Sequence, residues 1–406
     1  MKIGFFTDTY LPIIGGIPIS VKSHKDSLEK LGHKVYIITS QGPKNYEEKD
    51  ASIIRIKGIP IPFKGFEGHR FVLRFKKYLS LVKDLNLDTI HIHTEFPIGK
   101  LGIYASQKLN IPSVYTMHTM HEYFFNKSKN IGIKIFKLFF ILANRKALKK
   151  FISKTHSTIV PTHKILTLLE KDYNIKGKYN VVPTGFNLEK FYSQNHSLEE
   201  IQALKVKFNL VNDFVCIYVG RLSPEKDISY LISAFASFCQ NHPQSKFVIV
   251  GDGPEKKALQ KQVKQLQIEN NVCFLGFVPY DNLGIYYQLG NCFLSASLFE
   301  TQGLTFVEAM ASSLVLLARY DQALDGLIDN GNNAFFYHQK EELIHYLSLL
   351  YNDNKKTKTM SMNAKNSILN YDQTSFASKM ISIYKEAIKN NKENNNQNNN
   401  QNNNHN

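Results

Sequence analysis

Two glutamates, Glu300 and Glu308, are the residues whose type and spacing most directly suggest chemistry. They lie on either side of Gly303 and follow an apolar run at 292–296 that predicts a β-strand. This order puts Glu300 at the carboxyl end of a strand and Glu308 in the next helix, where open α/β sheets bind ligands. Carboxylates there can accept hydrogen bonds from the hydroxyl groups of a sugar. Taken alone, the pair is as compatible with a structural interpretation as with a functional one. In the structural interpretation one glutamate lies in a loop and the other on a solvated helix face.

A pair of cations upstream has the same kind of placement. Arg221 follows the apolar run 215–220, and Lys226 stands just before the next helical pattern. A guanidinium and an ammonium that converge there can bind a diphosphate and stabilise it as a leaving group. Either residue alone could be an ordinary surface cation, but the order strand, Arg, four residues, Lys and helix is more specific. The turn Gly251–Pro254 ends the next predicted strand and is expected to shape the same site.

Glycines and a histidine supply the candidates in the first half of the chain. Gly15 and Gly16 follow the first predicted strand and open a helix, so their N–H groups can approach a phosphate. There is no GxGxxG motif and no evident acidic ribose partner, which disfavours a nicotinamide cofactor. His118 ends another predicted strand, and His91 and His93 end the preceding one. A zinc site is disfavoured because no ligand spacing such as HExxH is present.

Alternating apolar and amphipathic runs predict the elements that position these residues. Such alternation is typical of parallel sheets covered by helices, and two sets of six strands predict two Rossmann-like, doubly wound α/β domains. A closing helix is expected over 373–389, followed by a disordered Asn/Gln-rich tail at 390–406; the domains are expected at 1–185 and 186–372. The predicted strands are 3–7, 35–39, 53–56, 89–93, 113–118 and 158–161, then 215–220, 247–251, 272–277, 292–296, 315–318 and 334–337.

Composition narrows the class of protein. The chain has 406 residues, 43% of them hydrophobic, and a net charge of +16. Residues 1–190 carry 31 Lys and Arg against 14 Asp and Glu, whereas the remainder is close to neutral. This asymmetry indicates that one half faces an anionic surface, either lipid headgroups or nucleic acid. No helix-turn-helix, zinc or RNP pattern accompanies the charge, so nucleic acid is disfavoured. Four widely spaced cysteines without a CxxC pair are expected to be reduced core residues of a cytoplasmic protein.

Together these motifs resemble the retaining family 4 glycosyltransferases of GT-B architecture, from Met1 to about Lys389. The amino-acid sequence is similar to that of the subgroup that glucosylates 1,2-diacylglycerol in three segments, Thr94–Gly102, Tyr115–Thr119 and Glu300–Thr305. Many members of the family follow the first glutamate with Gly-Phe-Gly, whereas Thr-Gln-Gly stands here. The resemblance implies a UDP-glucose donor, a diacylglycerol acceptor, retention of the α configuration and an active site between the two domains.

The resemblance also implies roles for individual residues. Arg221 and Lys226 would hold the diphosphate beside the backbone N–H of Gly16, while Glu300 and His118 would hold the sugar near the reacting carbon. No metal ion or other cofactor is implied, because two cations replace a metal at the phosphates. The remaining donor-site candidates lie in the Gly15 loop and in the stretch that leads into the helix: Gly15, Gly303, Leu304, Thr305 and Glu308.

The basic half gives a separate reason to expect lipid. Segment 69–83 places apolar side chains at helical spacing between cations, and segment 133–151 has a similar composition. Basic amphipathic helices of this kind lie at the surface of anionic membranes, although ordinary helices packed on a sheet could show the same stripes. We expect a peripheral protein on the cytoplasmic face of the membrane. The residues expected to contact membrane or acceptor are Arg70, Phe71, Arg74, Phe75, Lys76, Lys77, Lys134, Lys137 and Phe139.

Several alternatives stay open at this point. The sequence does not distinguish glucose from galactose, and the acceptor could be a phospholipid, a glycosylated lipid or a soluble sugar. A sugar-nucleotide epimerase would use the same fold, and a non-catalytic membrane- or nucleic-acid-binding protein would use the same charge. The oligomeric state cannot be deduced.

Overall fold

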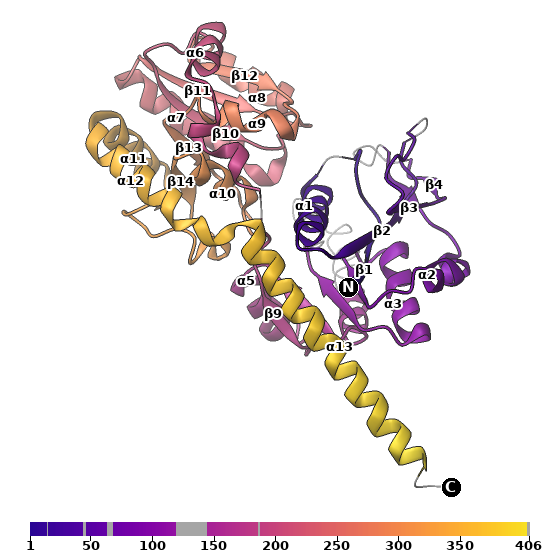
Figure 1. Ribbon diagram of the computed structural model, residues 1–406. Helices are drawn as coiled ribbons and strands as arrows, with labels where there is room; N and C mark the ends of the chain where they lie inside the picture. The colour runs from indigo at the N-terminus through magenta and orange to yellow at the C-terminus, as the bar shows by residue number, and fades with distance from the viewer. Residues whose placement is uncertain (14, 44–45, 63–67, 119–143, 186, 404–406) are drawn as a thin grey trace, which may run out of the picture. The chain divides into compact units, whose positions relative to one another are not determined.

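The computed structural model divides into two compact units, each described here by itself. Unit 1 comprises Met1–Phe186 and Gln373–Asn406, and unit 2 comprises Asn187–Asp372 (Figure 1). The structure describes all residues except 14, 44–45, 63–67, 119–143, 186 and 404–406, and the side chains of 370 and 395–403 are also outside the description.

Unit 1 is built on a parallel seven-stranded sheet with the order β3-β2-β1-β6-β7-β8-β9. The first six strands in chain order were predicted, because each is a short apolar run rich in β-branched residues. The seventh, β9, was not predicted, since it has three half-buried residues. The strands are β1 (Lys2–Thr7), β2 (Lys34–Ser40), β3 (Ile53–Ile56), β6 (Thr89–Ile92), β7 (Ser113–Thr116), β8 (Ser157–Val160) and β9 (Tyr179–Val181), with β4 (Ile59–Pro60) and β5 (Arg70–Phe71) as a separate antiparallel pair.

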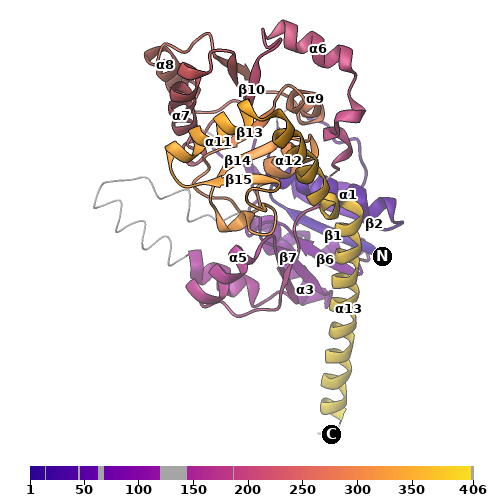
Figure 2. The ribbon, with the colours of Figure 1, turned by 90° about the vertical axis from the view of Figure 1, so that its left-hand side faces the viewer.

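Helices cover both faces of this sheet, and the alternation of side chains along β1 decides which helix meets which residue. Ile3 and Phe5 belong to a core that includes residues of α1 and α13, whereas Phe6 meets α3 at Gly102. Figures 1 and 2 show α13 running along unit 1. The helical elements are α1 (Gly16–Lys30), η1 (Phe75–Tyr78), α2 (Leu79–Asp84), α3 (Pro97–Leu109), a stretch at 144–152, α5 (His163–Thr167), the π-helical turn η3 (Leu168–Asp172) and α13 (Gln373–Asn403).

The C-terminal helix α13 is longer than the sequence predicts. Its apolar face, with Phe376, Met380 and Ile383, is buried on unit 1 as expected. The helix continues to Asn403, however, and does not end at 389, so the expected disorder from residue 390 is not what the structure describes. Asn391 explains part of the extension, because it bonds to the His156 ring and to the carbonyl of Asn110, which anchors the next turn.

Unit 2 contains a parallel six-stranded sheet with the order β12-β11-β10-β13-β14-β15, and all six strands were predicted. Cys216 on β10 faces the core formed with α7, α8 and α11. On the other face Phe293 of β13 packs against Tyr287 of α9 and Phe306 of α10. The strands are β10 (Phe214–Val219), β11 (Ser245–Val250), β12 (Val272–Gly276), β13 (Cys292–Ser295), β14 (Val315–Arg319) and β15 (Ala334–Tyr337).

In unit 2 an α-helix follows every strand except β14, which only a 3₁₀ turn separates from β15, and this alternation is typical of a doubly wound fold. The helices are α6 (Leu198–Lys207), α7 (Ile228–Asn241), α8 (Lys256–Gln265), α9 (Leu283–Tyr287), α10 (Leu304–Ala311), α11 (Lys340–Asn352) and α12 (Asn354–Ser367), with the 3₁₀ turns η4 (Glu189–Phe191), η5 (Ser193–Asn195), η6 (Pro224–Lys226), η7 (Tyr280–Asn282), η8 (Gln322–Leu324) and η9 (Leu369–Tyr371). The four cysteines are free, and three of them are buried. Within the described part of the chain, no helix is both long and apolar enough to cross a membrane.

Candidate active site

The cationic and acidic candidates of unit 2 gather where its strand order reverses. The strand β10 pairs with β11 on one side and with β13 on the other. The later strands therefore extend the sheet from β10 in two opposite directions. A crevice opens at such a reversal outside the carboxyl ends of the strands, and open α/β sheets bind ligands there. Arg221 follows β10 and Glu300 follows β13. Each residue thus follows the carboxyl end of a strand, as predicted, and the structure shows that the two strands are neighbours.

Lys226 and Glu300 are in direct contact. The Nζ of Lys226 lies 2.7 Å from Oε1 of Glu300, and the two side chains are 27% and 10% exposed. The Glu300 backbone N–H donates to Oδ2 of Asp321, which follows β14. These two bonds hold Glu300 in place beyond the end of β13, while Arg221, beyond the end of β10, is exposed. A cation that can meet a phosphate and a carboxylate that can meet a sugar are therefore already adjacent.

The turn that carries Lys226 is held by residues that the sequence did not single out. Asp227 has a left-handed backbone (φ 46°) and pairs with Arg319 at 3.0 Å. The Arg319 guanidinium also lies over the Tyr230 ring, 4.3 Å from its centroid. A backbone bond from Leu298 to the carbonyl of Glu225 ties the same turn to the loop that precedes Glu300. Arg319 stands at the end of β14, so the rule that identified Arg221 could have identified it.

Two glycines of unit 2, Gly251 and Gly303, lie where the backbone closely approaches other atoms. A Cβ on Gly251, whose φ is +140°, would lie 1.9 Å from the carbonyl oxygen of Gly220. Gly303 caps α10 with φ +77°, and a Cβ there would lie 2.8 Å from the Phe306 ring. The N–H groups of Leu304 and Thr305 begin this helix and have no acceptor within it, which is the usual arrangement for binding an anion.

Glu308 is buried among aromatic side chains. It is 4% exposed, and the Tyr287 hydroxyl donates to its Oε2 at 2.8 Å. Burial raises the pKa of Glu308 to about 7, although bonds from Tyr287 and Tyr280 and the charge of Lys190 act in the opposite direction. The Lys190 ammonium lies 3.2 Å from the centre of the Tyr280 ring. The expected position of Glu308 in the helix after Glu300 is confirmed, while its contact with a ribose stays a prediction.

In unit 1 the strand order reverses between β1 and β6. Gly15 and Gly16 follow β1, and Gly16 begins α1, as predicted. Asp8 also follows β1 and was missed by the sequence analysis. It accepts bonds from the Thr94 hydroxyl and from the backbone N–H of Ile98, so it caps the start of α3. Burial raises the pKa of Asp8 to about 6.

His118 lies just beyond β7 and belongs to a cluster of histidines. Its Nε2 is 3.0 Å from Nδ1 of His93, and their rings stack with centroids 5.3 Å apart. His91 uses both ring nitrogens, one toward the Tyr384 hydroxyl at 2.6 Å and one toward the Thr116 hydroxyl at 2.7 Å. The Tyr384 hydroxyl lies 3.4 Å from Nε2 of His24.

Burial keeps these histidines neutral. It lowers the pKa of His24 to about 3 and that of His118 to about 4, and it lowers the pKa values of His91 and His93 well below their usual range. For His118 the charge of Glu95 opposes the shift, and Glu95 in turn accepts a bond from the buried Tyr115 hydroxyl.

Three of these histidines lie close enough together to ligate a metal ion. Donor atoms of His24, His91 and His93 lie within 4.8 Å of one another. Ligation by His91 would require the loss of its bond to Tyr384 or to Thr116. The cluster is therefore better described as a hydrogen-bonded network of neutral rings.

The first expected membrane segment is not a single helix. Arg70 and Phe71 form β5, Arg74 has a left-handed backbone (φ 48°), and Phe75 begins the 3₁₀ turn η1. The helical spacing misled because Arg70 is fixed by the carbonyls of Gly42 and Gly58 at 3.0 and 3.2 Å, which holds β5 against β4. Arg70 is thus a structural residue of the hairpin.

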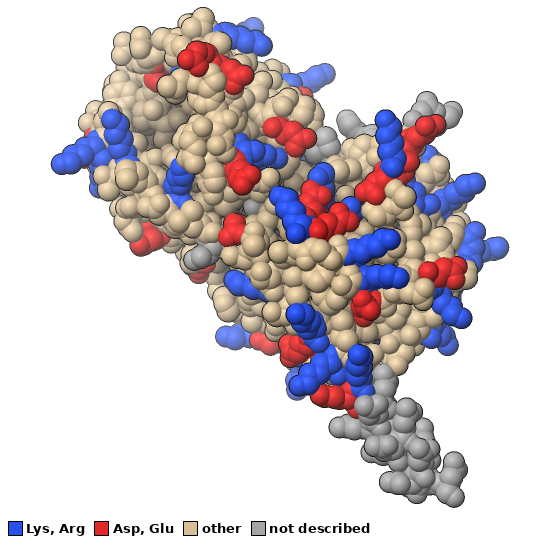
Figure 3. Space-filling model, in the orientation of Figure 1, with Lys and Arg blue, Asp and Glu red and all other residues tan. Residues whose placement is uncertain are grey.

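An exposed surface nevertheless exists at this hairpin. Two apolar residues that the sequence analysis did not select, Ile59 (56%) and Leu73 (52%), are more exposed than the predicted Phe71 (45%). We call the following set the hairpin surface: Ile59, Phe71, Leu73, Arg74, Lys76 and Lys77, whose cations are exposed. Figure 3 shows Lys and Arg across the visible face of unit 1 with Asp and Glu among them. Lys134, Lys137 and Phe139 lie outside the described residues.

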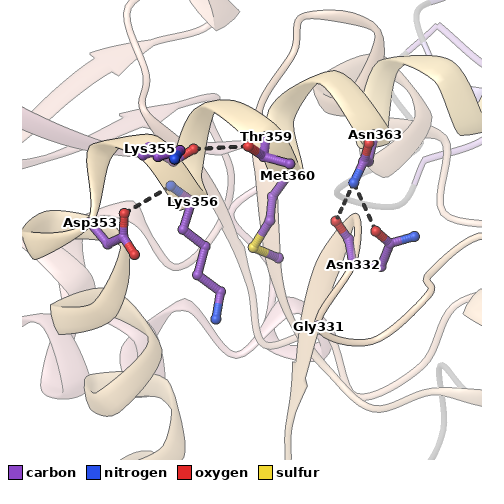
Figure 4. A pocket seen from close by; sticks show the side chains of 8 residues that line it. All are labelled: Gly331, Asn332, Asp353, Lys355, Lys356, Thr359, Met360 and Asn363. Carbon is purple, nitrogen blue, oxygen red and sulfur yellow. Dashed lines mark hydrogen bonds between the residues drawn. The ribbon is translucent and has the colours of Figure 1, made fainter.

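A shallow pocket elsewhere in unit 2 does not involve the candidate residues. It lies along α12, and Figure 4 shows its polar groups bonded to one another. The Asp353 carboxylate accepts from the backbone N–H of Lys356, and Asn363 donates to the carbonyl and side-chain oxygens of Asn332. These internal bonds satisfy groups that a ligand would need.

Comparison with known proteins agrees with this arrangement. The model of "Glycosyltransferase Family 4" matches residues 14–190, and that of "Glycosyl transferases group 1" matches residues 200–367. The α-monoglucosyldiacylglycerol synthase of Acholeplasma laidlawii is 40% identical over 97% of this chain and 99% of its own length. The enzyme of the same name from Streptococcus pneumoniae is 34% identical over 84% of this chain and 76% of its own.

Solved structures show the same fold. The Anabaena protein HepE in complex with UDP has a TM-score of 0.74 and 20% identity, covering 95% of this chain and all of its own. Sucrose-phosphate synthase from Thermosynechococcus elongatus also has a TM-score of 0.74, with 18% identity, covering 95% of this chain and 98% of its own. The fold of two Rossmann-like units agrees with both family matches. It also agrees with the 40% identity to the Acholeplasma laidlawii enzyme over 97% of this chain. The chain belongs to the family 4 glycosyltransferases of GT-B architecture.

Proposed function

We propose that this enzyme transfers glucose from UDP-glucose to the free hydroxyl of 1,2-diacylglycerol and retains the α configuration. The observation that carries the proposal is the likeness, over nearly the whole chain, to a protein named α-monoglucosyldiacylglycerol synthase. In the reaction the bond between the sugar C1 and the diphosphate oxygen breaks. The acceptor oxygen bonds to C1 on the same face, and its proton passes to the departing phosphate.

Unit 2 supplies the groups that this chemistry needs at the diphosphate. Arg221 and Lys226 follow β10. The first turn of α10, which begins four residues after Glu300, offers backbone N–H groups. Cations and N–H groups aimed at a leaving diphosphate stabilise the charge that develops on it, typically by about 3–4 kcal/mol for one well-placed donor. The proposed reaction therefore uses protein cations where other transferases use a metal ion.

The sugar and the nucleoside have separate partners in the proposal. Glu300 accepts hydrogen bonds from sugar hydroxyls, and Glu308 serves the ribose or uridine. In unit 1 the N–H of Gly16 assists at the phosphate, and His118 donates to the sugar near C1. The UDP in the HepE structure supports a uridine nucleotide as donor for this fold.

The acceptor is reached from the membrane in this proposal. The hairpin surface combines exposed apolar side chains with Arg74, Lys76 and Lys77. Cations near an anionic leaflet contribute about 1 kcal/mol each, and apolar side chains add to this as they enter the interface. The enzyme would then act as a peripheral protein on the cytoplasmic face.

The experiment combines the purified protein, radiolabelled UDP-glucose and mixed micelles of diacylglycerol, with and without an anionic phospholipid. Label in the organic phase that increases with anionic lipid is the expected result, and analysis of the product would identify an α linkage. UDP release without labelled lipid would overturn the proposal in favour of a soluble acceptor or an epimerase. Label from UDP-galactose but not from UDP-glucose would overturn the assignment of the donor sugar.

A further inference from the structure

The pair formed by the buried His93 and the half-buried His118 holds one proton between two nitrogens. Nδ1 of His93 and Nε2 of His118 are 3.0 Å apart, so one of them donates and the other accepts. Burial lowers the pKa of both rings, so both are neutral near pH 7. In a neutral imidazole one nitrogen carries the hydrogen, and the bond made by one nitrogen decides the role of the other.

The remaining nitrogen of His93 distinguishes the two arrangements. His93 Nε2 is buried and has no hydrogen-bond partner among the described residues. Its ring packs against the rings of His91 and Phe5, with centroids 4.1 and 4.8 Å away. If His118 were the donor, His93 would carry its hydrogen on Nε2 and bury an N–H with no acceptor. Orphaned buried N–H groups are rarer than orphaned acceptors, so Nδ1 of His93 carries the hydrogen.

We propose that His93 is a positioning residue that donates from Nδ1 to Nε2 of His118 and so keeps the hydrogen of His118 on Nδ1. This nitrogen is the one that His118 then presents as a donor to the sugar. The inference rests on the role of His118 in the proposed function. It predicts that an incorrect tautomer of His118 would leave the ring in place and remove the hydrogen bond that the transfer needs.

Two substitutions at position 93 distinguish the effect of losing the hydrogen-bond donor from the effect of changing the volume of the side chain. His93→Asn keeps an amide N–H close to the place of Nδ1, whereas His93→Phe keeps a ring and removes the donor. His91→Asn is the matched control, because His91 is equally buried but bonds to Tyr384 and Thr116 instead of His118. Far-ultraviolet circular dichroism and thermal unfolding would identify variants that fail to fold.

The direct measurement is a long-range proton–nitrogen correlation spectrum of ¹⁵N-histidine-labelled protein at pH 7.5. His118→Gln assigns the signals of His118 by their disappearance. The wild type and His93→Asn should show His118 with a protonated Nδ1, and His93→Phe should shift it toward protonated Nε2. With UDP-glucose and diacylglycerol micelles, kcat should fall about 10- to 100-fold in His93→Phe and much less in His93→Asn.

The outcomes separate this inference from the proposed function. A protonated Nε2 on His118 in the wild type, or an unchanged tautomer in His93→Phe, would overturn it. A changed tautomer with full activity would also overturn it, since His93 would then position nothing that the reaction uses. If the wild type transferred no glucose to lipid, the proposed function would fail, yet the spectrum would still decide the tautomer.

Discussion

Substitution of Lys226 by methionine should affect both stability and catalysis, and the structure allows the two effects to be separated. Lys226 lies 2.7 Å from Glu300, whose side chain is only 10% exposed. Removing one partner of a fully buried pair costs about 3–5 kcal/mol, and an exposed pair contributes about 0–1 kcal/mol. Because Lys226 is 27% exposed, we expect an intermediate loss of about 2 kcal/mol in the free energy of unfolding of unit 2.

Thermal unfolding and a double-mutant cycle test this value. For a unit of this size about 2 kcal/mol corresponds to a decrease of roughly 4–8 °C in Tm. Glu300→Gln removes the charge that Lys226→Met leaves behind, so the double variant should regain about 1 kcal/mol relative to the sum of the single variants. Lys365→Met is the control, since Lys365 is half-buried like Lys226 but bonds to the neutral side chain of Gln194. It should change Tm by less than about 1 °C.

Activity should not follow stability in this cycle. If Lys226 neutralises the leaving diphosphate, Lys226→Met should lower kcat by about 10²- to 10³-fold, and Glu300→Gln should not restore it. Initial rates of lipid labelling at saturating UDP-glucose, measured well below Tm, provide the comparison. Recovery of activity together with stability in the double variant would refute the assignment of Lys226 to the diphosphate. Full activity of Lys226→Met would do the same.

Three further expectations concern other parts of the site. Glu308 has a folded-state pKa of about 7 against an ordinary value of 4.5, so its protonated form favours the folded state. Unit 2 should therefore lose about 3 kcal/mol as pH rises from about 4.5 to 7, and Glu308→Gln should flatten that part of a urea-unfolding pH series. Gly303→Ala should cost about 1–3 kcal/mol, because φ is +77° and the new Cβ would lie 2.8 Å from Phe306; calorimetry would show it, together with weaker UDP binding by titration. The double variant Ile59→Asp, Leu73→Asp should weaken sedimentation with anionic vesicles at least tenfold and leave UDP affinity unchanged, because neither residue belongs to the donor site.

The strands could be predicted from the sequence because each carries its signal locally. Twelve apolar runs gave the twelve longer strands of the two sheets, while β9 and the pair β4–β5 have two or three residues each, too few for a pattern. Segment 69–83 failed for a related reason. Its apolar spacing fits a helix, but Arg70 is fixed by carbonyls 12 and 28 positions away, and a local pattern does not contain that bond.

The candidate site shows the same division between local and distant information. The rule that ligand-binding residues follow strand ends was enough to select Arg221 and Glu300. It could not reveal that Glu300 bonds to Lys226, 74 positions away, or that Tyr384 bonds to His91, 293 positions away. Such partners are determined by the order in which strands and helices assemble. Asp321 follows a strand too, and its bond from the backbone N–H of Glu300, 21 positions away, is another contact that a local pattern does not contain.

The pairing of Lys226 with Glu300 has a consequence for the order of events in the proposed reaction. An ammonium that already neutralises a carboxylate has less attraction left for a second anion, so an arriving diphosphate competes with Glu300 for Lys226. As the phosphate gains the ammonium, the carboxylate becomes a stronger acceptor for the sugar hydroxyls. UDP alone fills the phosphate position without a sugar to compensate Glu300, whereas UDP-glucose supplies both. We therefore expect Glu300→Gln to bind UDP more tightly than the wild type and UDP-glucose no more tightly, which titration calorimetry with both ligands would show.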